Sequence, residues 1–271
     1  MSIRSIFIAI VVFLGLGILI GCSSEKFLMD TIAVIGDKVI TEEQIKNEIA
    51  ERNIAIKILE KLYQQNQSDI IAPKDDLLQT LNMKEEDLSK EQKRYIEARE
   101  RSAILPLTEN EAFNILLREE VLYQVALKQG YEVSQQRALQ VLEESDEQSK
   151  RNAANDESTF KSYNEALKIQ DEVVREYGFE TWSSYQENRA DKLAQAMTIN
   201  LMKNRFKDSI EEKLPNSALT GIDKIIAIDN AWEDYTEFLL NGEKIKIVDN
   251  KFYVKLYGEA WSYGEMNLSS K

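Results

Sequence analysis

Histidine is absent from the 271-residue sequence, and cysteine, proline and glycine are scarce, at one, three and ten residues. Without histidine, a Ser-His-Asp or Cys-His catalytic group cannot form, and the usual zinc sites lack their ligands. Glycine-rich phosphate motifs are also missing, because Gly15 and Gly17 lie in the amino-terminal apolar run and Gly258 and Gly264 show no Walker pattern. We therefore expect a binding protein with no catalytic residue, no cofactor and no metal.

A pair of carboxylates is the remaining route to catalysis. Asp75-Asp76 and Glu119-Glu120 are adjacent pairs, but such pairs arise by chance among 47 acidic residues. Two catalytic carboxylates from distant segments would leave no signature in the sequence. A carboxylate-based activity therefore stays open as the weakest alternative.

The charge of the chain is strongly one-sided, with a formal net charge of −13. An acidic surface repels the phosphates of nucleic acids and anionic lipid headgroups, so we expect no nucleic-acid partner. The acidic residues are interleaved with lysines along the chain, which is typical of solvated helix faces. Because helix-breaking residues are few, long helices should make up most of the fold.

The amino terminus has the pattern of a lipoprotein signal peptide. Arg4 supplies the positive charge, and an uncharged apolar run of 15 residues extends from Ile6 to Ile20. A membrane-spanning helix needs about 20 apolar residues. The run ends at Gly21-Cys22, which resembles the bacterial lipobox, and Cys22 is the only cysteine. This resemblance implies cleavage after Gly21, diacylation of Cys22 and an anchor on the extracytoplasmic face of a membrane; an uncleaved membrane anchor is the alternative.

The body of the chain is predicted to be mainly α-helical. Thr41 with Gln44 and Thr108 with Glu111 have the spacing of capping boxes, and Gly130 stands where a helix-ending glycine is expected. Apolar spacing of three to four residues predicts helices, and polar stretches predict loops at 64–73 and 145–158. The expected helices cover residues 41–63, 75–83, 89–103, 108–129, 134–149, 160–177, 182–214 and 228–242.

Short extended segments are predicted at both ends of this body. A small turn at Gly36-Asp37 separates two apolar stretches within residues 32–40. Near the carboxyl end, residues 245–247 and 252–256 alternate in polarity around Asp249-Asn250. This alternation predicts a carboxy-terminal β-hairpin.

Aromatic and methionine residues could form a binding surface. The helix positions of most of them favour core packing, whereas the two in the glycine-flanked terminal stretch are better candidates for an exposed contact. The residues considered are Trp182, Tyr185, Trp232, Trp261, Tyr263, Met197 and Met202.

Three segments together resemble the SurA, PrsA and trigger-factor-related chaperone domains. They are Val34-Ile35-Gly36-Asp37-Lys38-Val39-Ile40-Thr41, the helix Leu116 to Ser134 with its "A-x-x-x-G-x-x-V-S" ending, and Tyr177 to Tyr185. Ile35 stands where the family usually has asparagine. The order and spacing of the three segments agree with the family over roughly residues 31–213.

The resemblance implies a domain that binds unfolded polypeptides outside the cytoplasmic membrane. The family's prolyl isomerase domain carries active-site histidines, so its absence is implied here, where 56 residues follow Pro215 and no histidine is present. The expected organisation is a signal peptide at 1–21, a lipidated tether at 22–30, a SurA N-like helical domain at 31–214, and a helix plus hairpin at 215–271. The expected function is an ATP-independent chaperone; a scaffold lipoprotein for one dedicated envelope partner is the alternative.

Overall fold

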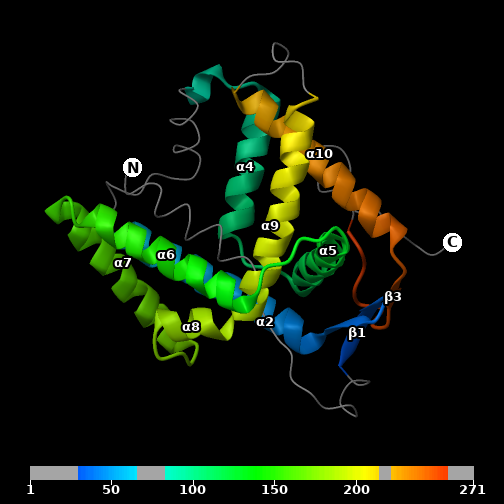
Figure 1. Ribbon diagram of the computed structural model, residues 1–271, viewed down its shortest axis with the longest axis horizontal. Coiled ribbons are helices and arrows are strands. Elements are labelled where there is room, and N and C mark those ends of the chain that lie inside the picture. Colours follow the sequence, from blue (N-terminus) through cyan, green and yellow to red (C-terminus); the bar gives the residue numbers. More distant parts are fainter. Residues whose placement is uncertain (1–29, 66–82, 214–220, 256–271) are drawn as a thin grey trace.

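The computed structural model describes residues 30–65, 83–213 and 221–255 (Figure 1). Helices dominate this part of the chain, and a three-stranded antiparallel sheet completes it, which confirms the mainly α-helical class with a small β element. The strands are β1 (Thr31–Ile35), β2 (Lys38–Thr41) and β3 (Ile245–Ile247). The helices are α2 (Glu42–Gln65), α4 (Lys90–Ile104), α5 (Glu109–Lys128), α6 (Gln135–Ala153), α7 (Glu157–Glu176), α8 (Trp182–Asn188), α9 (Ala190–Glu211) and α10 (Gly221–Gly242).

The sheet joins the two ends of the described chain. Strand β1 lies between β2 and β3, and the turn that links β1 to β2 contains Gly36 with a φ of 59°, a left-handed conformation that glycine adopts freely. Ala33 pairs with Ile247 and Ile35 pairs with Ile245. The predicted turn at Gly36-Asp37 is therefore confirmed, and an amino-terminal strand is held by a carboxy-terminal one.

The predicted hairpin of 245–247 with 252–256 is wrong, because β3 pairs with β1. Phe252 donates its amide hydrogen to the carbonyl of Asp249 at 3.2 Å, so the chain turns. Phe252 and Val254 then bury their side chains in the apolar core beneath the sheet, and no strand is formed over residues 248–255. Leu256 lies outside the described residues.

The apolar core beneath the sheet unites both ends of the sequence. Phe113 of α5 packs on Phe252 with ring centroids 5.3 Å apart. Asn114 is buried and holds the terminal segment, donating to the carbonyl of Tyr253 at 3.0 Å and accepting from the amide of Lys255 at 2.6 Å. The buried members of this core are Ile32, Ala33, Ile35, Ile40, Ile45, Ala112, Phe113, Leu117, Val121, Leu240, Phe252 and Val254.

Helix ends follow the capping signals of the sequence. Thr41 and Gln44 exchange the two hydrogen bonds of a capping box at 2.8 and 3.2 Å, and Thr108 and Glu111 form another. Gly130 has a φ of 84° just beyond the end of α5. The predicted caps and the predicted helix from residue 89 are confirmed, whereas residues 66–82, which contain most of one predicted helix and one predicted loop, lie outside the described part.

Two predictions for the middle of the chain are wrong. Helix α6 continues through most of the predicted loop at 145–158, because Ala153 is fully buried and Tyr163 donates to Asp146 at 2.8 Å, which pairs α6 with α7. The helix predicted for 182–214 is interrupted at Arg189, whose φ of −101° and ψ of 10° separate α8 from α9. Burial of the Arg189 side chain, described below, accounts for the break.

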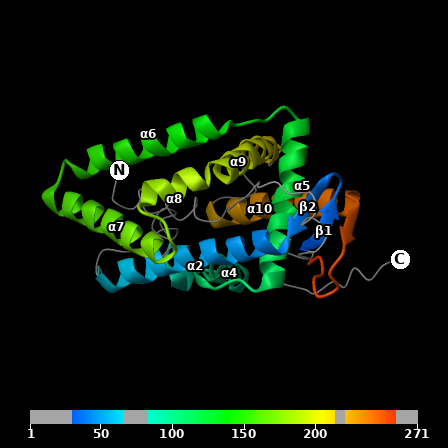
Figure 2. The ribbon, with the colours of Figure 1, turned by 90° about the horizontal axis from the view of Figure 1, so that it is seen from below.

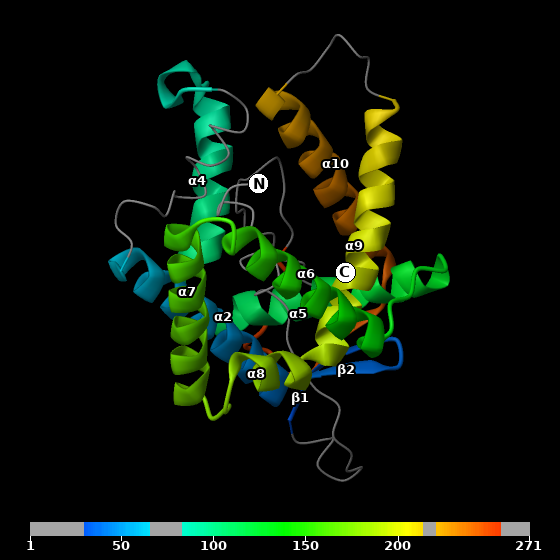
Figure 3. The same cartoon turned by 60° about the vertical axis from the view of Figure 1, so that its left-hand side comes forward.

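The elements are arranged along one long axis. Figure 2 places the sheet near one end and the turn between α6 and α7 at the other, with α2 running between them. Figure 3 shows α4, α10 and α9 extending beyond α5 in a common direction. Helix α10 contacts α9, α5 and α4, so the carboxy-terminal helix packs against elements from the rest of the chain.

Candidate functional site

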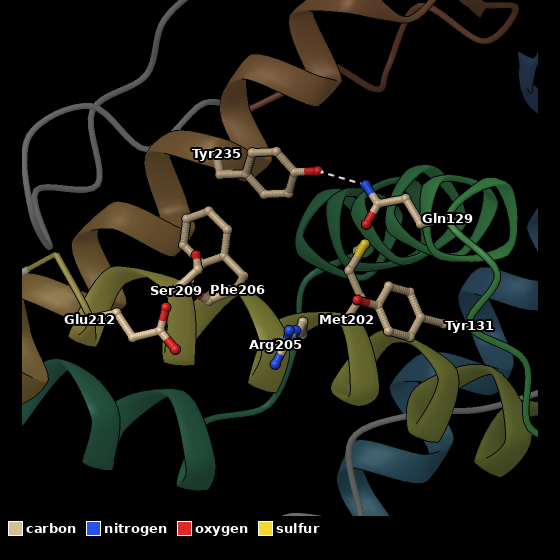
Figure 4. A pocket seen from close by; sticks show the side chains of 8 residues that line it. All are labelled: Gln129, Tyr131, Met202, Arg205, Phe206, Ser209, Glu212 and Tyr235. Atoms are coloured by element: carbon tan, nitrogen blue, oxygen red, sulfur yellow. Dashed lines mark hydrogen bonds between the residues drawn. The ribbon is translucent and has the colours of Figure 1, made fainter.

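A pocket with a volume of about 210 Å³ opens where the end of α5 meets α9 and α10 (Figure 4). Helix α9 supplies most of its wall, and α5 with the following turn and α10 supply the rest. The residues that line it are Gln129, Tyr131, Met202, Arg205, Phe206, Ser209, Glu212 and Tyr235.

Local structure explains how these side chains come together. Met202, the adjacent Arg205 and Phe206, and Ser209 follow one another at intervals of three to four residues along α9, and Glu212 comes three residues later at its C-cap, so they share one face of the helix. Gly130 ends α5 with a left-handed backbone, and the amide of Tyr131 donates back to the carbonyl of Ala126 at 3.0 Å. This turn delivers Tyr131 to the pocket, while Gln129 donates to the hydroxyl of Tyr235 at 3.2 Å across it.

An aromatic cluster forms the wall between α9 and α10. Phe206 stacks on Tyr235 with centroids 4.9 Å apart and ring planes 20° apart. Phe206 also meets Trp232 edge-on at 5.4 Å, and Trp232 is only 3% exposed. The ammonium group of Lys203 lies 5.4 Å from the Trp232 ring centroid. Because these rings hold one another, the apolar wall of the pocket is preorganised.

The rim of the pocket is charged. Arg205 and Glu212 are both exposed, and within the described part of the chain neither of them forms an ion pair. Ser209 donates its hydroxyl hydrogen to the carbonyl of Phe206 at 2.7 Å. The pocket thus offers one positive and one negative side chain beside an apolar interior.

The size and lining of the pocket suit a single side chain. Pockets for drug-sized ligands occupy roughly 300–1,000 Å³, so a volume of about 210 Å³ admits a smaller group. Aromatic rings and Met202 would contact an apolar group, and the charged rim would contact polar atoms of the chain that carries it. Ser209, the one serine among the described residues that line the pocket, donates its hydroxyl hydrogen to a backbone carbonyl and not to a base.

A second cluster of functional groups is buried between α2 and the junction of α8 with α9. Arg189 lies 3.0 Å from a carboxylate oxygen of Glu51, and Lys192 lies 2.5 Å from a carboxylate oxygen of Glu48. All four side chains are at most 4% exposed. The break at Arg189 therefore turns its guanidinium group into the interior, toward α2.

This cluster has more carboxylates than cations. Glu119 of α5 interacts with the same charges, and desolvation by burial raises the pKa of its carboxyl well above the usual value. Burial likewise raises the pKa of Glu51, and its Oε1 atom accepts no hydrogen bond within the described residues. The carboxyl groups of Glu48, Glu51 and Glu119 thus face only the two cations Arg189 and Lys192. In a poorly hydrated interior this excess of acids favours retention of a proton by one of the carboxyl groups.

A third cluster joins α4, α9 and α10. Asp229 accepts from the hydroxyl of Tyr95 at 2.6 Å and lies 3.0 Å from Lys207 and 3.3 Å from Arg99. Burial opposes the charge of Asp229, but the hydrogen bond from Tyr95 and the attraction of Lys207 outweigh it and lower the pKa of Asp229. Burial and the neighbouring Lys207 also lower the pKa of Lys203. Through Asp229 the cluster links α10 to both α4 and α9.

The aromatic and methionine candidates divide between core and pocket. Trp232 is buried behind the pocket, and Met202 reaches the pocket lining while being only 2% exposed. Trp182 and Tyr185 pack together with centroids 5.2 Å apart, and Met197 packs on the core between α6 and α9. Of the candidates that lie within the described residues, only Met202 lines the pocket.

Other predicted residues fall outside this site. Cys22, Trp261, Tyr263 and the pair Asp75-Asp76 lie outside the described residues. Glu119 joins the buried cluster, whereas its neighbour Glu120 accepts a hydrogen bond from Gln124 at 2.8 Å. The two members of this adjacent pair therefore do not act together.

Sequence reasoning missed the polar lining of the pocket. Arg205, Ser209 and Glu212 read as ordinary exposed positions of a long helix. Their spacing from Met202 was the available signal, since it places them on one face. The convergence of Gln129 and Tyr131 on that face depends on how α5 crosses α9, which no local pattern encodes.

Comparison of the chain with family models, with curated proteins and with solved structures found no match. The chaperone-domain resemblance therefore stands on the three sequence segments alone. Within residues 30–65, 83–213 and 221–255, no helix is both long and apolar enough to cross a membrane. No three acidic, cysteine or histidine side chains in these ranges are grouped so that they could hold a metal ion.

Proposed function

We propose that this protein is a lipid-anchored extracytoplasmic binding protein that holds exposed segments of unfolded or exported polypeptides without catalysing a reaction. The pocket between α5, α9 and α10 would accept one side chain of such a segment. The observation that carries the proposal is a preorganised aromatic pocket of about 210 Å³ beside the charges of Arg205 and Glu212, which form no ion pair with any other described residue.

Weak, reversible capture follows from this geometry. One buried anchor side chain contributes a limited amount of apolar contact, so binding would be loose and tolerant of sequence. Binding an unfolded chain lowers its free concentration and slows its aggregation, with no need for ATP. The acidic surface would keep the complex soluble.

Aggregation of a denatured client tests the proposal. The chain from Ser23 onward, which lacks Cys22, should suppress light scattering at several-fold molar excess while leaving the rate of prolyl isomerisation unchanged. Ser209→Phe should fill the pocket and weaken the protection, whereas Ser158→Phe, at the start of α7, should not. Both variants are compared only after thermal unfolding confirms that each is folded. Unchanged aggregation at every excess would refute the proposal.

A scaffold for one dedicated partner is the second candidate. The small volume of the pocket favours it, because a site for one side chain also suits one fixed residue on a folded protein. Isolation of the lipidated protein from detergent-solubilised membranes distinguishes the two. A single partner in stoichiometric amount would favour the scaffold, and a diffuse mixture of polypeptides would favour the holding function.

A further inference from the structure

The buried ionic cluster lies where three helices meet. Helix α5 runs across both α2 and α9 (Figure 2). At the start of α9, Lys192 lies 2.5 Å from a carboxylate oxygen of Glu48 and 3.9 Å from one of Glu51, both on α2. Glu119 of α5 interacts with the same charges, so the cluster joins α2, α5 and α9. Its charged members are Glu48, Glu51, Glu119, Arg189 and Lys192.

Glu119 is the carboxyl group of this cluster that has no cation of its own. Within the described residues it forms no ion pair, whereas the two cations of the cluster are each engaged by a glutamate of α2. Arg118, its neighbour on α5, is engaged by Glu233 of α10. Burial raises the pKa of the Tyr185 hydroxyl on α8, which also interacts with the cluster, so this group stays protonated and adds no charge. The excess of one negative charge is therefore not offset by these neighbours.

A bound proton removes this excess. Desolvation by burial raises the pKa of Glu119 well above its usual value and also raises the pKa of Glu51. The Oε1 atom of Glu51 accepts no hydrogen bond within the described residues, so it is open to a proton. When the proton leaves, carboxylates of α2 and α5 face each other with one cation too few, and they repel. The close packing of these helices is thus favoured below the raised pKa and loses that advantage as the pH rises through it.

Two helices of this cluster continue to the pocket over the same distance. Glu119 precedes Gln129 by ten residues along α5 and its cap, and Lys192 precedes Met202 by ten residues along α9. At 1.5 Å per residue, either path is about 15 Å long. Because packed helices shift as units, a change in how α5 meets α9 at the cluster alters the spacing of the pocket walls. The apolar core that joins these two stretches has the buried members Leu122, Ala126, Ile199, Met202 and Trp232.

We propose that one proton held among these carboxyl groups is a latch that keeps the pocket in the shape that binds polypeptides, and that its release at alkaline pH lowers the affinity of the pocket. The inference concerns regulation and rests on the proposed function of the pocket. One proton changes the ratio of the two arrangements at most about tenfold per pH unit. A protein on the extracytoplasmic face of a membrane is exposed to the pH of its surroundings, so the latch would make polypeptide binding respond to that pH.

The distance between two spin labels tests the latch without any client. The chain from Ser23 onward has no cysteine, so Lys128→Cys and Asp208→Cys place labels at exposed positions on α5 and α9, outside the pocket lining. Pulsed electron paramagnetic resonance gives the distance distribution at mildly acidic and mildly alkaline pH. The same labels are placed in Glu119→Gln, which leaves two carboxylates facing two cations, and in the matched control Glu120→Gln. Circular dichroism confirms that each variant is folded.

We expect the distance distribution of the parent to shift between the two pH values, and that of Glu120→Gln to shift in the same way. Glu119→Gln should keep one distribution, that of the parent at acidic pH, under both conditions. An unchanged distribution in the parent, or a shift that persists in Glu119→Gln, would overturn the latch.

Binding of carboxymethylated lactalbumin, a permanently unfolded polypeptide, then tests the effect on the pocket. Its dissociation constant, measured by fluorescence anisotropy, should rise several-fold from mildly acidic to mildly alkaline pH for the parent and for Glu120→Gln, and it should stay constant for Glu119→Gln. Equal pH dependence in all three proteins would overturn the regulation. Absence of binding at both pH values would instead count against the proposed function, and the label distances would still decide whether the latch exists.

Discussion

Helix α2 is held by apolar packing near its start and by buried ion pairs about one turn further along. Near its start, Ile45 packs into the apolar core beneath the sheet. Beyond that, Glu48 and Glu51 enter a buried ionic cluster with Lys192 and Arg189. The apolar core gains free energy by burying surface, whereas the ionic cluster first has to offset the cost of removing four charges from water.

Compared with the apolar core, the ionic cluster determines the relative position of the helices more than it adds to the stability of the fold. Apolar side chains tolerate small shifts in register, but a buried charge is strongly penalised when its partner is displaced. Arg189 and Lys192 lie on either side of the start of α9, so their pairing with α2 fixes where the chain bends between α8 and α9. The ionic cluster therefore sets the position of α9, and with it the face that lines the pocket.

Removal of one partner from the ionic cluster should have the largest effect. Lys192→Met leaves the Glu48 carboxylate buried without its cation, and we expect a loss of about 3–5 kcal/mol in the free energy of unfolding. Urea denaturation followed by circular dichroism measures it. The matched control is Lys46→Met, which removes an exposed ion pair with Glu42 and should change the free energy of unfolding far less, because water screens that pair. Similar losses for the two variants would contradict the distinction drawn here.

Truncation in the apolar core should cost a comparable or somewhat smaller amount. Leu117 is fully buried beneath the sheet, and Leu117→Ala should lower the free energy of unfolding by about 2–5 kcal/mol through lost contacts and the cavity left behind. The same urea titration measures this change. A smaller loss of unfolding free energy than that of the control Lys46→Met would show that the apolar core beneath the sheet is not tightly packed.

Stability should depend on pH through the ionic cluster. The pKa of Glu119 is raised above its usual 4.5, so the folded state binds more protons than the unfolded state between 4.5 and the raised pKa. This contribution to stability is fully present below pH 4.5 and is lost as the pH rises through that interval, by at most about 1.4 kcal/mol per pH unit. Glu119→Gln should flatten the dependence measured by thermal melts at mildly acidic and mildly alkaline pH. A variant with the slope of the parent would contradict it.

Replacement of both members of one buried pair should have the smallest effect. Glu48→Met combined with Lys192→Met removes two charges together and leaves apolar side chains of similar length, so the free energy of unfolding should change little or rise. Urea denaturation of the double variant, compared with Lys192→Met, gives the coupling between the two residues. A double variant as unstable as the single one would mean that the pair does not act as a unit.

Local signals in the sequence anticipated most of the helices but not the way they meet. Thr108 with Glu111 and Gly130 marked both ends of α5 because caps depend on residues within one turn. The pairing of β3 with β1 could not be read in this way, since Ile245 and Ile35 are brought together only by the whole intervening fold. The break at Arg189 was missed for a similar reason: its cause is Glu51, which lies far away in the sequence.

Photocrosslinking at the pocket tests the central claim most directly. Glu212, exposed on the pocket rim, is replaced by benzoylphenylalanine in the lipidated protein, and Ser158 at the start of α7 is replaced in the same way as a control. Irradiation with an unfolded client is followed by mapping of the adducts. We predict crosslinks from position 212, competed by excess unlabelled client, and few from position 158. Equal crosslinking at the two positions, or none at position 212, would contradict the assignment of this pocket as the site that holds polypeptides.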